Sequence, residues 1–308
     1  MTKVVFFGNE RLVSGLNKTA APILTGLIDG GYDVVAVVSH HTLAKSRNDR
    51  GLEVGEIAKK HNIPLLLPAK PSEITTQLKE LQADVAVLVA YGRIISQEVI
   101  NIFPHGIINI HPSLLPNYRG PTPIEAALLN GDPQTGVSIM QLTAGMDEGP
   151  VYAQESFSLT GSEDKFDLYE KITDITTPLF FDVFPKIVDG SLQPTPQDNN
   201  AATYCKLIEK KDSYIDWEKP AVELEREVRA YLGWPQSRTR LGGIEVIITK
   251  AHIQSGVTPP GEIVFQNDKT LSVGTGKDLL TIDSLKPPGK KEMPISAFLS
   301  GYKNQLNY

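Results

Sequence analysis

Three polar side chains suited to acyl transfer lie next to apolar segments of this chain. Asn109 and His111 end the segment GIINIH (residues 106–111), and Asp147 lies in GMDEGP (residues 145–150). An Asn amide can donate hydrogen bonds to the oxyanion that forms in acyl transfer. A His can exchange a proton with an attacking amine, and a carboxylate would orient that imidazole. These residue types predict acyl transfer without a covalent intermediate.

Other kinds of site find less support in the sequence. Cys205, the single cysteine, is isolated in a polar connection, and Ser113 has no evident base. His40 and His41 are adjacent and would point apart on an extended segment, with no further ligand at metal-binding spacing, so we expect no metal. Gly8 opens no dinucleotide-binding G-x-G-x-x-G. Asn109 and His111 also suit a pair that caps a turn, and their spacing alone does not decide between capping and catalysis.

The first half of the chain alternates apolar strand patterns with helical patterns, which predicts an α/β fold with a Rossmann-like, mostly parallel sheet. Asn109 and His111 project from the same face of their strand because strand side chains alternate. Asp147 reaches them only if the sheet folds back. The expected strands cover residues 3–7, 34–38, 64–67, 85–90 and 107–111, and the expected helices cover 21–28, 52–60, 72–81 and 96–100.

The remainder predicts the end of this domain and a second, smaller one. We expect a helix at 124–129, strands at 137–142 and 151–157, and a long helix at 164–188 interrupted at Pro178. A polar connection follows. After a helix from 218 to about 231, short strands at 246–249, 261–265, 271–273 and 279–282 suggest a small OB-like β-barrel. The expected organisation is a catalytic domain at 1–189, a linker at 190–206 and a C-terminal β-barrel domain at 207–308.

Composition limits the classes of protein to consider. The 308 residues are 41% hydrophobic and 21% charged, and no apolar run is long enough to span a bilayer. The start of the chain has no signal-peptide pattern, and a single cysteine favours a reducing, cytoplasmic setting. The net charge of −6 argues mildly against nonspecific nucleic-acid binding. Residues 1–199 have 15 basic and 23 acidic side chains, whereas residues 200–308 have 15 and 13, so the second half is better suited to a polyanion.

The segments around the three polar residues resemble a known family. The chain reads NIHPSLLP at 109–116, YRG at 118–120 and MDEGP at 146–150, which resembles the 10-formyltetrahydrofolate-dependent formyltransferases. The resemblance implies that Asn109, His111 and Asp147 are catalytic and that 10-formyltetrahydrofolate is the cosubstrate. It also implies that the folate is held with the help of Ser113, Leu114, Leu115, Pro116, Val89, Ala90, Tyr91 and Gly92.

The second half resembles one branch of that family. ATYCK at 202–206, IDW at 215–217 and RAYLGWP at 229–235 look like the linker and C-terminal domain of the methionyl-tRNA formyltransferases. This resemblance implies initiator methionyl-tRNA as acceptor and partner, and we expect a monomer. The expected tRNA contacts are Lys45, Arg47, Arg50, Lys286, Lys290 and Lys291.

Three departures from the family pattern and two alternatives stay open. The chain has Gly8-Asn9-Glu10-Arg11 where the family has Gly-Thr-Pro-Glu-Phe, an atypical loop at 39–50, and Pro112 in place of the Ala common in the tRNA enzymes. The acceptor could be an amino sugar nucleotide, because sugar formyltransferases share His-x-Ser-Leu-Leu-Pro. A noncatalytic tRNA- or folate-binding protein is the alternative from another class.

Overall fold

The chain divides into two compact units. The computed structural model describes residues 1–16, 18–40, 52–267 and 269–306. The first unit comprises residues 1–123, 134–158 and 169–206, and the second comprises 124–133, 159–168 and 207–308. Two short segments that precede residue 169 therefore belong to the second unit. Within the described residues, no helix combines the length and apolarity that crossing a membrane requires.

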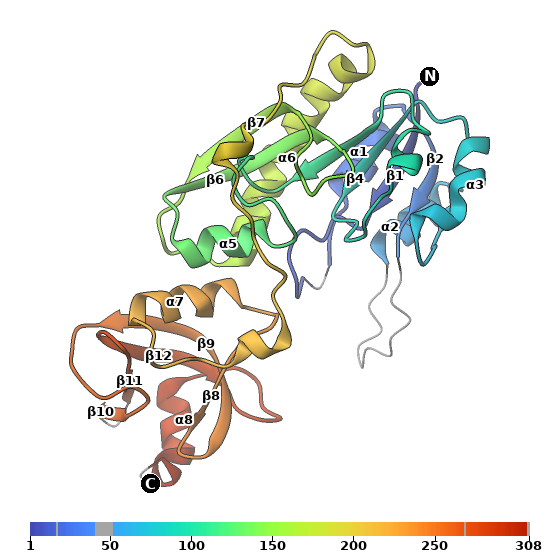
Figure 1. Ribbon diagram of the computed structural model, residues 1–308. Coiled ribbons are helices and arrows are strands. Elements are labelled where there is room, and N and C mark those ends of the chain that lie inside the picture. Colours follow the sequence, from blue (N-terminus) through green and yellow to red (C-terminus); the bar gives the residue numbers. More distant parts are fainter. Residues whose placement is uncertain (17, 41–51, 268, 307–308) are drawn as a thin grey trace. The chain divides into compact units, whose positions relative to one another are not determined.

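The first unit is built on a seven-stranded mixed sheet in the order β3-β2-β1-β4-β5-β6-β7 (Figure 1). The first five strands in this order pair in parallel, and β5–β6 and β6–β7 pair antiparallel. The mostly parallel, Rossmann-like sheet predicted from the sequence is confirmed. The strands are β1 (Lys3–Gly8), β2 (Asp33–Val38), β3 (Leu65–Leu66), β4 (Val85–Val89), β5 (Ile107–His111), β6 (Gln134–Gln141) and β7 (Val151–Ser158).

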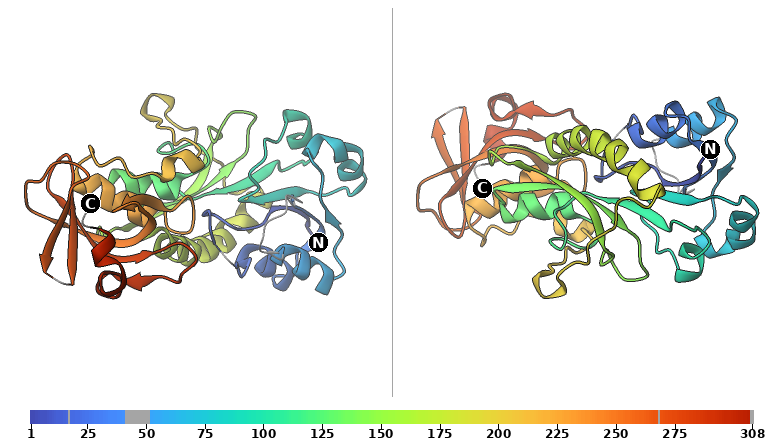
Figure 2. Two further views of the ribbon diagram at one scale, coloured as in Figure 1. Left: turned by 90° about the horizontal axis from the view of Figure 1, so that it is seen from below. Right: turned by 90° about the horizontal axis from the view of Figure 1, so that it is seen from above.

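Helices cover the parallel part of this sheet because its central strands β4 and β5 are buried on both faces. α3 and α4 pack with Val5, Phe7 and Leu88 in one buried cluster. α1 and α6 lie side by side (Figure 1, Figure 2), where the ring of Phe181 closely approaches Gly26. The helices in the chain before residue 207 are α1 (Pro22–Asp29), α2 (Glu53–Lys60), α3 (Thr75–Glu80), α4 (Gln97–Ile100), α5 (Pro123–Asn130) and α6 (Lys165–Val188), with 3-10 turns η1 (Pro71–Ile74) and η2 (Asn199–Ala201). α5 after Pro123 belongs to the second unit.

The parallel strand order reverses between β1 and β4, and this is where open α/β sheets bind ligands. β1 ends at Gly8, whose φ is 130° and where an added Cβ would lie 1.8 Å from the Val89 carbonyl oxygen. The same carbonyl accepts the backbone N–H groups of Asn9 and Glu10, at 3.2 and 3.3 Å. Gly8 therefore allows the chain leaving β1 to run directly against the end of β4.

The second unit contains an antiparallel six-stranded sheet. Its main path is β10-β11-β12-β9-β8, with β13 paired to β12. Leu271, Ile282, Leu285 and Phe298 lie at the centre of its core. The smaller C-terminal β domain predicted from the sequence is confirmed, and its strands pair antiparallel. Its elements are η3 (Lys210–Ser213), α7 (Ala221–Ala230), β8 (Ser237–Leu241), β9 (Ile244–Gln254), β10 (Ile263–Asn267), β11 (Thr270–Gly274), β12 (Leu279–Lys286), β13 (Met293–Pro294), α8 (Ile295–Tyr302) and η4 (Lys303–Gln305).

Buried polar contacts join distant segments of the chain inside this second unit. The fully buried Lys165 ammonium donates to the Trp234 carbonyl at 2.7 Å and lies 3.6 Å from Oε1 of Glu125. Burial lowers the pKa of Lys165, while the Glu125 carboxylate opposes that shift. These contacts help explain why residues 124–133 and 159–168 belong with the chain after residue 207.

Some sequence-based expectations about elements were wrong. α6 is continuous through Pro178 and Pro185, although the sequence predicted an interruption at Pro178. A proline inside a helix removes one hydrogen bond, but Phe180 and Phe184 after Pro178 are fully buried and stack on each other, which offsets that loss. The expected helix at 72–81 is a 3-10 turn followed by α3, and β8 and α8 were not anticipated.

Candidate active site

β5 presents Asn109 and His111 on one face, as the alternation of strand side chains requires. All five residues of β5 are buried, and Asn109 and His111 are only 5% and 4% exposed. Asn109 lies between Leu88 of β4 and Met140 of β6 in the sheet register. Both polar side chains line a cleft. A central strand with apolar neighbours therefore holds the two groups rigidly.

Asp147 reaches the same cleft because the sheet folds back. β6 pairs antiparallel to β5, and the connection from β6 to β7 contains Asp147 in the left-handed conformation, at φ 50°. One carboxylate oxygen, Oδ2, accepts the Gly120 N–H at 2.8 Å and lies 3.7 Å from Nδ1 of His111. The structure thus brings together the three side chains that the sequence singled out.

A backbone carbonyl determines which ring nitrogen of His111 holds a proton. Nε2 lies 2.9 Å from the Tyr118 carbonyl oxygen, which can only accept. Nε2 is therefore the protonated nitrogen of the neutral ring. Nδ1 faces Asp147 and is free to take up a proton, after which the nearby carboxylate stabilises the charged ring.

The cleft has a volume of about 490 Å³ and is lined mostly by apolar groups. The hydroxyls of Tyr91 and Thr143 are buried without a hydrogen-bond partner among the described residues. Burial raises the pKa of Tyr91 to about 12, so its hydroxyl keeps its proton and can donate. The lining residues are Arg11, Leu12, Leu88, Ala90, Tyr91, Gly92, Arg93, Ile94, Ile95, Asn109, Ile110, His111, Pro112, Gly120, Pro121, Pro123, Leu142, Thr143, Ala144, Gly145, Met146 and Asp147.

The residues expected to hold folate divide into two groups. Ala90, Tyr91 and Gly92 line the cleft, whereas Val89, Ser113, Leu114, Leu115 and Pro116 lie outside its lining. The loop after β5 is bonded to the neighbouring antiparallel strands. Ser138 donates to the Ser113 carbonyl at 2.6 Å, and Gln154 donates to the Leu115 carbonyl at 2.8 Å. These contacts support the wall behind His111.

The residues expected to contact tRNA lie elsewhere in the chain. Lys286 ends β12, and Lys290 and Lys291 lie in the connection to β13, with all three side chains exposed. Lys45, Arg47 and Arg50 lie outside the residues that the structure describes. Within the described ranges, no group of three or more His, Cys, Asp or Glu side chains is placed to hold a metal ion.

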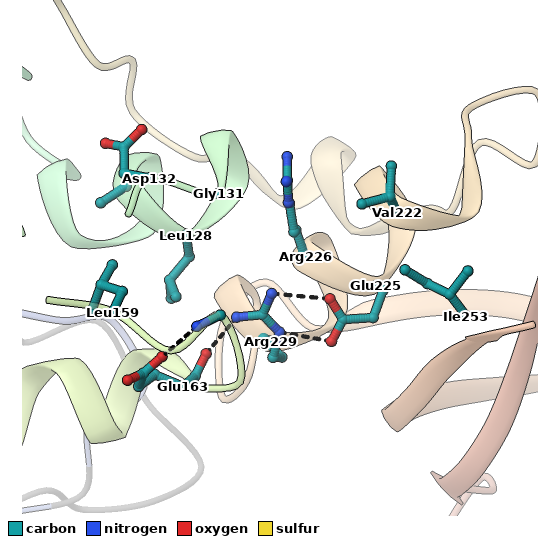
Figure 3. A pocket seen from close by; sticks show the side chains of 12 residues that line it. Leu128, Gly131, Asp132, Leu159, Glu163, Val222, Glu225, Arg226, Arg229 and Ile253 are labelled. Atoms are coloured by element: carbon teal, nitrogen blue, oxygen red, sulfur yellow. Dashed lines mark hydrogen bonds and ion pairs between the residues drawn. The ribbon is translucent and has the colours of Figure 1, made fainter. Parts of the chain in front are cut away.

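A smaller cavity, of about 190 Å³, lies in the second unit (Figure 3). Its guanidinium groups are held by the protein itself. Arg229 donates to both carboxylate oxygens of Glu225 and to the Glu163 carbonyl, and Arg226 donates to the Asn130 carbonyl. These bonds indicate a structural role, and the larger cleft is the better candidate for catalysis.

Sequence reasoning did not assign roles to several groups around the cleft. Arg11 and Thr143 line it, and Gly120 supplies the N–H that holds Asp147. A signal existed for Gly120, which stands in the YRG segment of the resemblance. No periodic pattern marked Arg11 or Thr143, because each follows the end of a strand and reaches the cleft through the path of its loop.

Comparison with known proteins gives two adjacent matches. A model described as formyl transferase matches residues 3–184, and one described as formyl transferase, C-terminal domain, matches residues 207–303. The chain belongs to the formyl transferase family.

Proteins similar to this formyltransferase match it along nearly the whole chain. The methionyl-tRNA formyltransferase of Chloroflexus aurantiacus is 37% identical over 298 residues, covering 94% of this chain and 96% of that protein. The methionyl-tRNA formyltransferase of Coxiella burnetii is 34% identical over 310 residues, covering 99% and 96%.

Solved structures similar to this formyltransferase include more distant enzymes. An N-formyltransferase from Helicobacter canadensis, in complex with folinic acid and dTDP-3-aminofucose, has a TM-score of 0.70 at 17% identity, covering 95% of this chain and all of that one. HypX from Aquifex aeolicus, in complex with tetrahydrofolic acid, has a TM-score of 0.64 at 20% identity, covering 97% and 47%. At these identities the likeness shows the fold alone.

Proposed function

We propose that this formyltransferase moves the formyl group of 10-formyltetrahydrofolate to the α-amine of initiator methionyl-tRNA. The observation that carries the catalytic assignment is the meeting of Asn109, His111 and Asp147 at one cleft. The acceptor is supported by the methionyl-tRNA formyltransferases that are 34–37% identical along nearly the full chain. Sugar formyltransferases share the fold at 17–18% identity, which favours no acceptor.

The three side chains fit the steps of this reaction. The α-amine attacks the formyl carbon, and the carbonyl oxygen becomes an oxyanion that the Asn109 amide stabilises by donating a hydrogen bond. Nδ1 of His111 takes the proton from the attacking nitrogen, and the Asp147 carboxylate stabilises the resulting imidazolium. The tetrahedral intermediate then collapses, the bond from the formyl carbon to N10 breaks, and N10 receives the proton from His111.

The cleft residues fit a folate with its polar ring edge inward. The buried hydroxyls of Tyr91 and Thr143 would find partners in that polar edge, while Leu88, Ile95 and Leu142 offer apolar contact. Ala90 and Gly92 border the same space. In this proposal Val89 and residues 113–116 support the folate site through the backbone that they hold in place.

The remaining assignments concern the acceptor and the domains. We assign residues 1–189 to catalysis, 190–206 to the linker and 207–308 to tRNA binding, with Lys286, Lys290 and Lys291 contacting phosphates. Lys45, Arg47 and Arg50 are proposed as further tRNA contacts. The enzyme is proposed to act as a monomer in the cytoplasm, where translation begins.

A formylation assay tests the reaction. Purified protein is incubated with 10-formyltetrahydrofolate and either initiator methionyl-tRNA, elongator methionyl-tRNA or a nucleotide-linked amino sugar, and formyl transfer is measured for each. We expect rapid transfer to the initiator tRNA. Transfer to the amino sugar alone would assign the sugar acceptor, and tight folate binding without transfer to any amine would assign a noncatalytic protein.

A single substitution tests the catalytic assignment. Asn109→Ala removes the oxyanion donor and is expected to lower kcat by roughly 10²-fold or more. The control is Asn101→Ala at the exposed end of α4, outside the cleft, which should leave kcat unchanged. A folded Asn109→Ala protein with near-normal kcat would refute the proposed role.

A further inference from the structure

The connection after α6 returns to the catalytic loops of the first unit. We call residues 195–206 the linker strap. Thr195 and Val151 exchange two backbone hydrogen bonds of 2.8 Å, and Tyr204 pairs with Arg119 in a parallel bridge. The linker strap thus runs along the two chain segments that hold Asp147 and His111. It belongs to the same compact unit as both residues.

One side chain of the linker strap holds the loop of Asp147. The Gln197 amide nitrogen donates to the Asp147 carbonyl at 2.8 Å and to the Gly149 carbonyl at 2.7 Å. Asp147 has a left-handed backbone at φ 50°, a conformation that L-residues rarely adopt unless their surroundings hold them there. The two bonds from Gln197 supply that restraint on both sides of Glu148.

A buried arginine orients the Gln197 amide. Arg119 is 1% exposed, and its Nε and Nη2 donate to the Gln197 side-chain oxygen at 3.0 and 2.8 Å. Nη2 also donates to the side-chain oxygen of Asn199 at 2.8 Å. Because the guanidinium only donates, the Gln197 oxygen must face Arg119, and its NH2 group must face the two carbonyls.

The linker strap also holds the partner of His111. The Tyr118 carbonyl accepts from Nε2 of His111, and the Tyr118 N–H donates to the Thr203 hydroxyl at 2.9 Å. The Thr203 backbone makes two more bonds, accepting from the Arg119 N–H at 2.9 Å and donating to the Pro116 carbonyl at 3.2 Å. The position of the Tyr118 carbonyl, which bonds Nε2 of His111, therefore depends on Thr203.

We propose that Gln197 and Thr203 are positioning residues for formyl transfer, acting through Asp147 and His111 respectively. The inference rests on the proposed catalytic roles of those two residues. Gln197 and Thr203 do not line the cleft. They hold the carboxylate and the imidazole in the relative geometry that lets Nδ1 exchange a proton, and a displacement of about 1 Å can cost a reaction roughly 10²-fold.

Gln197→Glu is the most selective test. A glutamate has the same length and still accepts hydrogen bonds from Arg119, so the contact between Arg119 and the linker strap is kept. It cannot donate to the Asp147 and Gly149 carbonyls, and its second oxygen repels them, so the restraint on that loop is lost. We expect kcat to fall about tenfold or more, while the KM values for formyltetrahydrofolate and methionyl-tRNA change less than about threefold.

The matched control is Gln193→Glu. Gln193 is an exposed glutamine of the same connection whose amide donates to the Gly190 carbonyl, and its substitution should leave kcat unchanged. The folded fraction of each variant is measured from the stoichiometry of tetrahydrofolate binding by calorimetry. This measurement separates misplacement of Asp147 from partial unfolding, because unfolding lowers the stoichiometry without changing kcat per binding site.

Thr203→Val supplies a second, independent readout. Valine keeps the shape of threonine and the backbone bonds but removes the acceptor of the Tyr118 N–H, and kcat should fall several-fold at unchanged KM. If kcat per binding site stays within twofold of wild type in both Gln197→Glu and Thr203→Val, the inference is wrong. If Asn109→Ala, assayed alongside, keeps normal activity, the proposed catalytic site itself is wrong.

Discussion

At the scale of single residues, the proposed chemistry depends on which ring nitrogen of His111 faces which partner. The Tyr118 carbonyl engages Nε2, and Nδ1 is left toward the Asp147 carboxylate at 3.7 Å. The distance suits an ion pair with a charged imidazole and leaves the proton of Nδ1 available for exchange. In the proposed mechanism Asp147 therefore acts chiefly through its charge.

The charge of Asp147 can be removed without removing its hydrogen bond. Asp147→Asn keeps an oxygen that accepts the Gly120 N–H but leaves the imidazolium without a neighbouring carboxylate. We expect kcat to fall by roughly 10²-fold, within the range of acid–base contributions in enzymes, with an unchanged melting temperature. A kcat within threefold of wild type in single-turnover assays would show that the charge is dispensable.

The placement of single residues could be predicted where the alternation of side chains along a strand decides which face a residue is on. Asn109 and His111 share a face because they stand two apart on a strand, and the structure places both in the cleft. Gln197 was not predictable, because its partners are backbone carbonyls 48 and 50 positions away. Only the folded chain brings such groups together.

At the scale of elements, the first helix is stabilised by an unusual cap. Glu10 is 3% exposed and its carboxylate accepts the N–H groups of Ile23 and Leu24, at 3.1 and 2.8 Å, at the start of α1. Burial raises the pKa of Glu10 from 4.5 to about 7, although the two backbone N–H groups act against this shift. The carboxyl is therefore poised to titrate near neutral pH.

The raised pKa gives the stability of the fold a pH dependence of known sign. Below pH 4.5 the carboxyl is protonated in both the folded and unfolded chains, and its full contribution to stability is present. Between pH 4.5 and about 7 the unfolded chain ionises more readily, so the free energy of unfolding falls, by up to roughly 3 kcal/mol.

Glu10→Gln should remove this pH dependence. The change in urea midpoint from pH 5 to pH 8 is measured for wild type, for Glu10→Gln and for the control Glu56→Gln on the exposed side of α2. We expect wild type and Glu56→Gln to lose stability relative to Glu10→Gln as the pH rises. Parallel pH profiles for all three proteins would contradict the assignment.

The prediction of helices and strands succeeded where the periodicity of apolar residues is clear. It failed where tertiary packing overrides the local preference of the chain. The alternation of apolar strands and helices was enough to predict the parallel sheet. α6 passes through Pro178 because Phe180 and Phe184, on its buried face, stack on each other in the core. The missed strand β8 had a usable signal, since Ser237, Thr239 and Leu241 alternate with two arginines before a Gly-Gly turn.

At the scale of the whole molecule, the uneven charge of the chain matters for a polyanionic acceptor. A protein with a net charge of −6 needs local basic groups to contact phosphates. Lys286, Lys290 and Lys291 supply three such groups in one short exposed segment of the second unit.

Replacing these three lysines tests their role in tRNA binding. The triple variant Lys286→Ala, Lys290→Ala, Lys291→Ala should raise the KM for methionyl-tRNA and leave the KM for formyltetrahydrofolate unchanged. The dependence of log KM on log salt should weaken by roughly 0.7–0.9 for each tRNA phosphate that the variant no longer neutralises. The control replaces Lys59 and Lys60 with Ala and should leave the salt dependence unchanged. If the triple variant also shows an unchanged salt dependence, this segment is not part of the tRNA interface.

The sequence by itself determined the class of fold, the strand that presents Asn109 and His111, and the candidate reaction. The fold class and the strand follow from short-range facts, because side chains alternate on strands and apolar runs are buried. The reaction follows from the resemblance of the segments around Asn109, His111 and Asp147 to the formyltransferases. Only the tertiary structure decided that Asp147 meets His111, that the Tyr118 carbonyl engages Nε2 of His111, and that the linker strap bonds to the loops of both residues. Those contacts join loops whose paths depend on backbone hydrogen bonds between distant segments, and no local pattern encodes them.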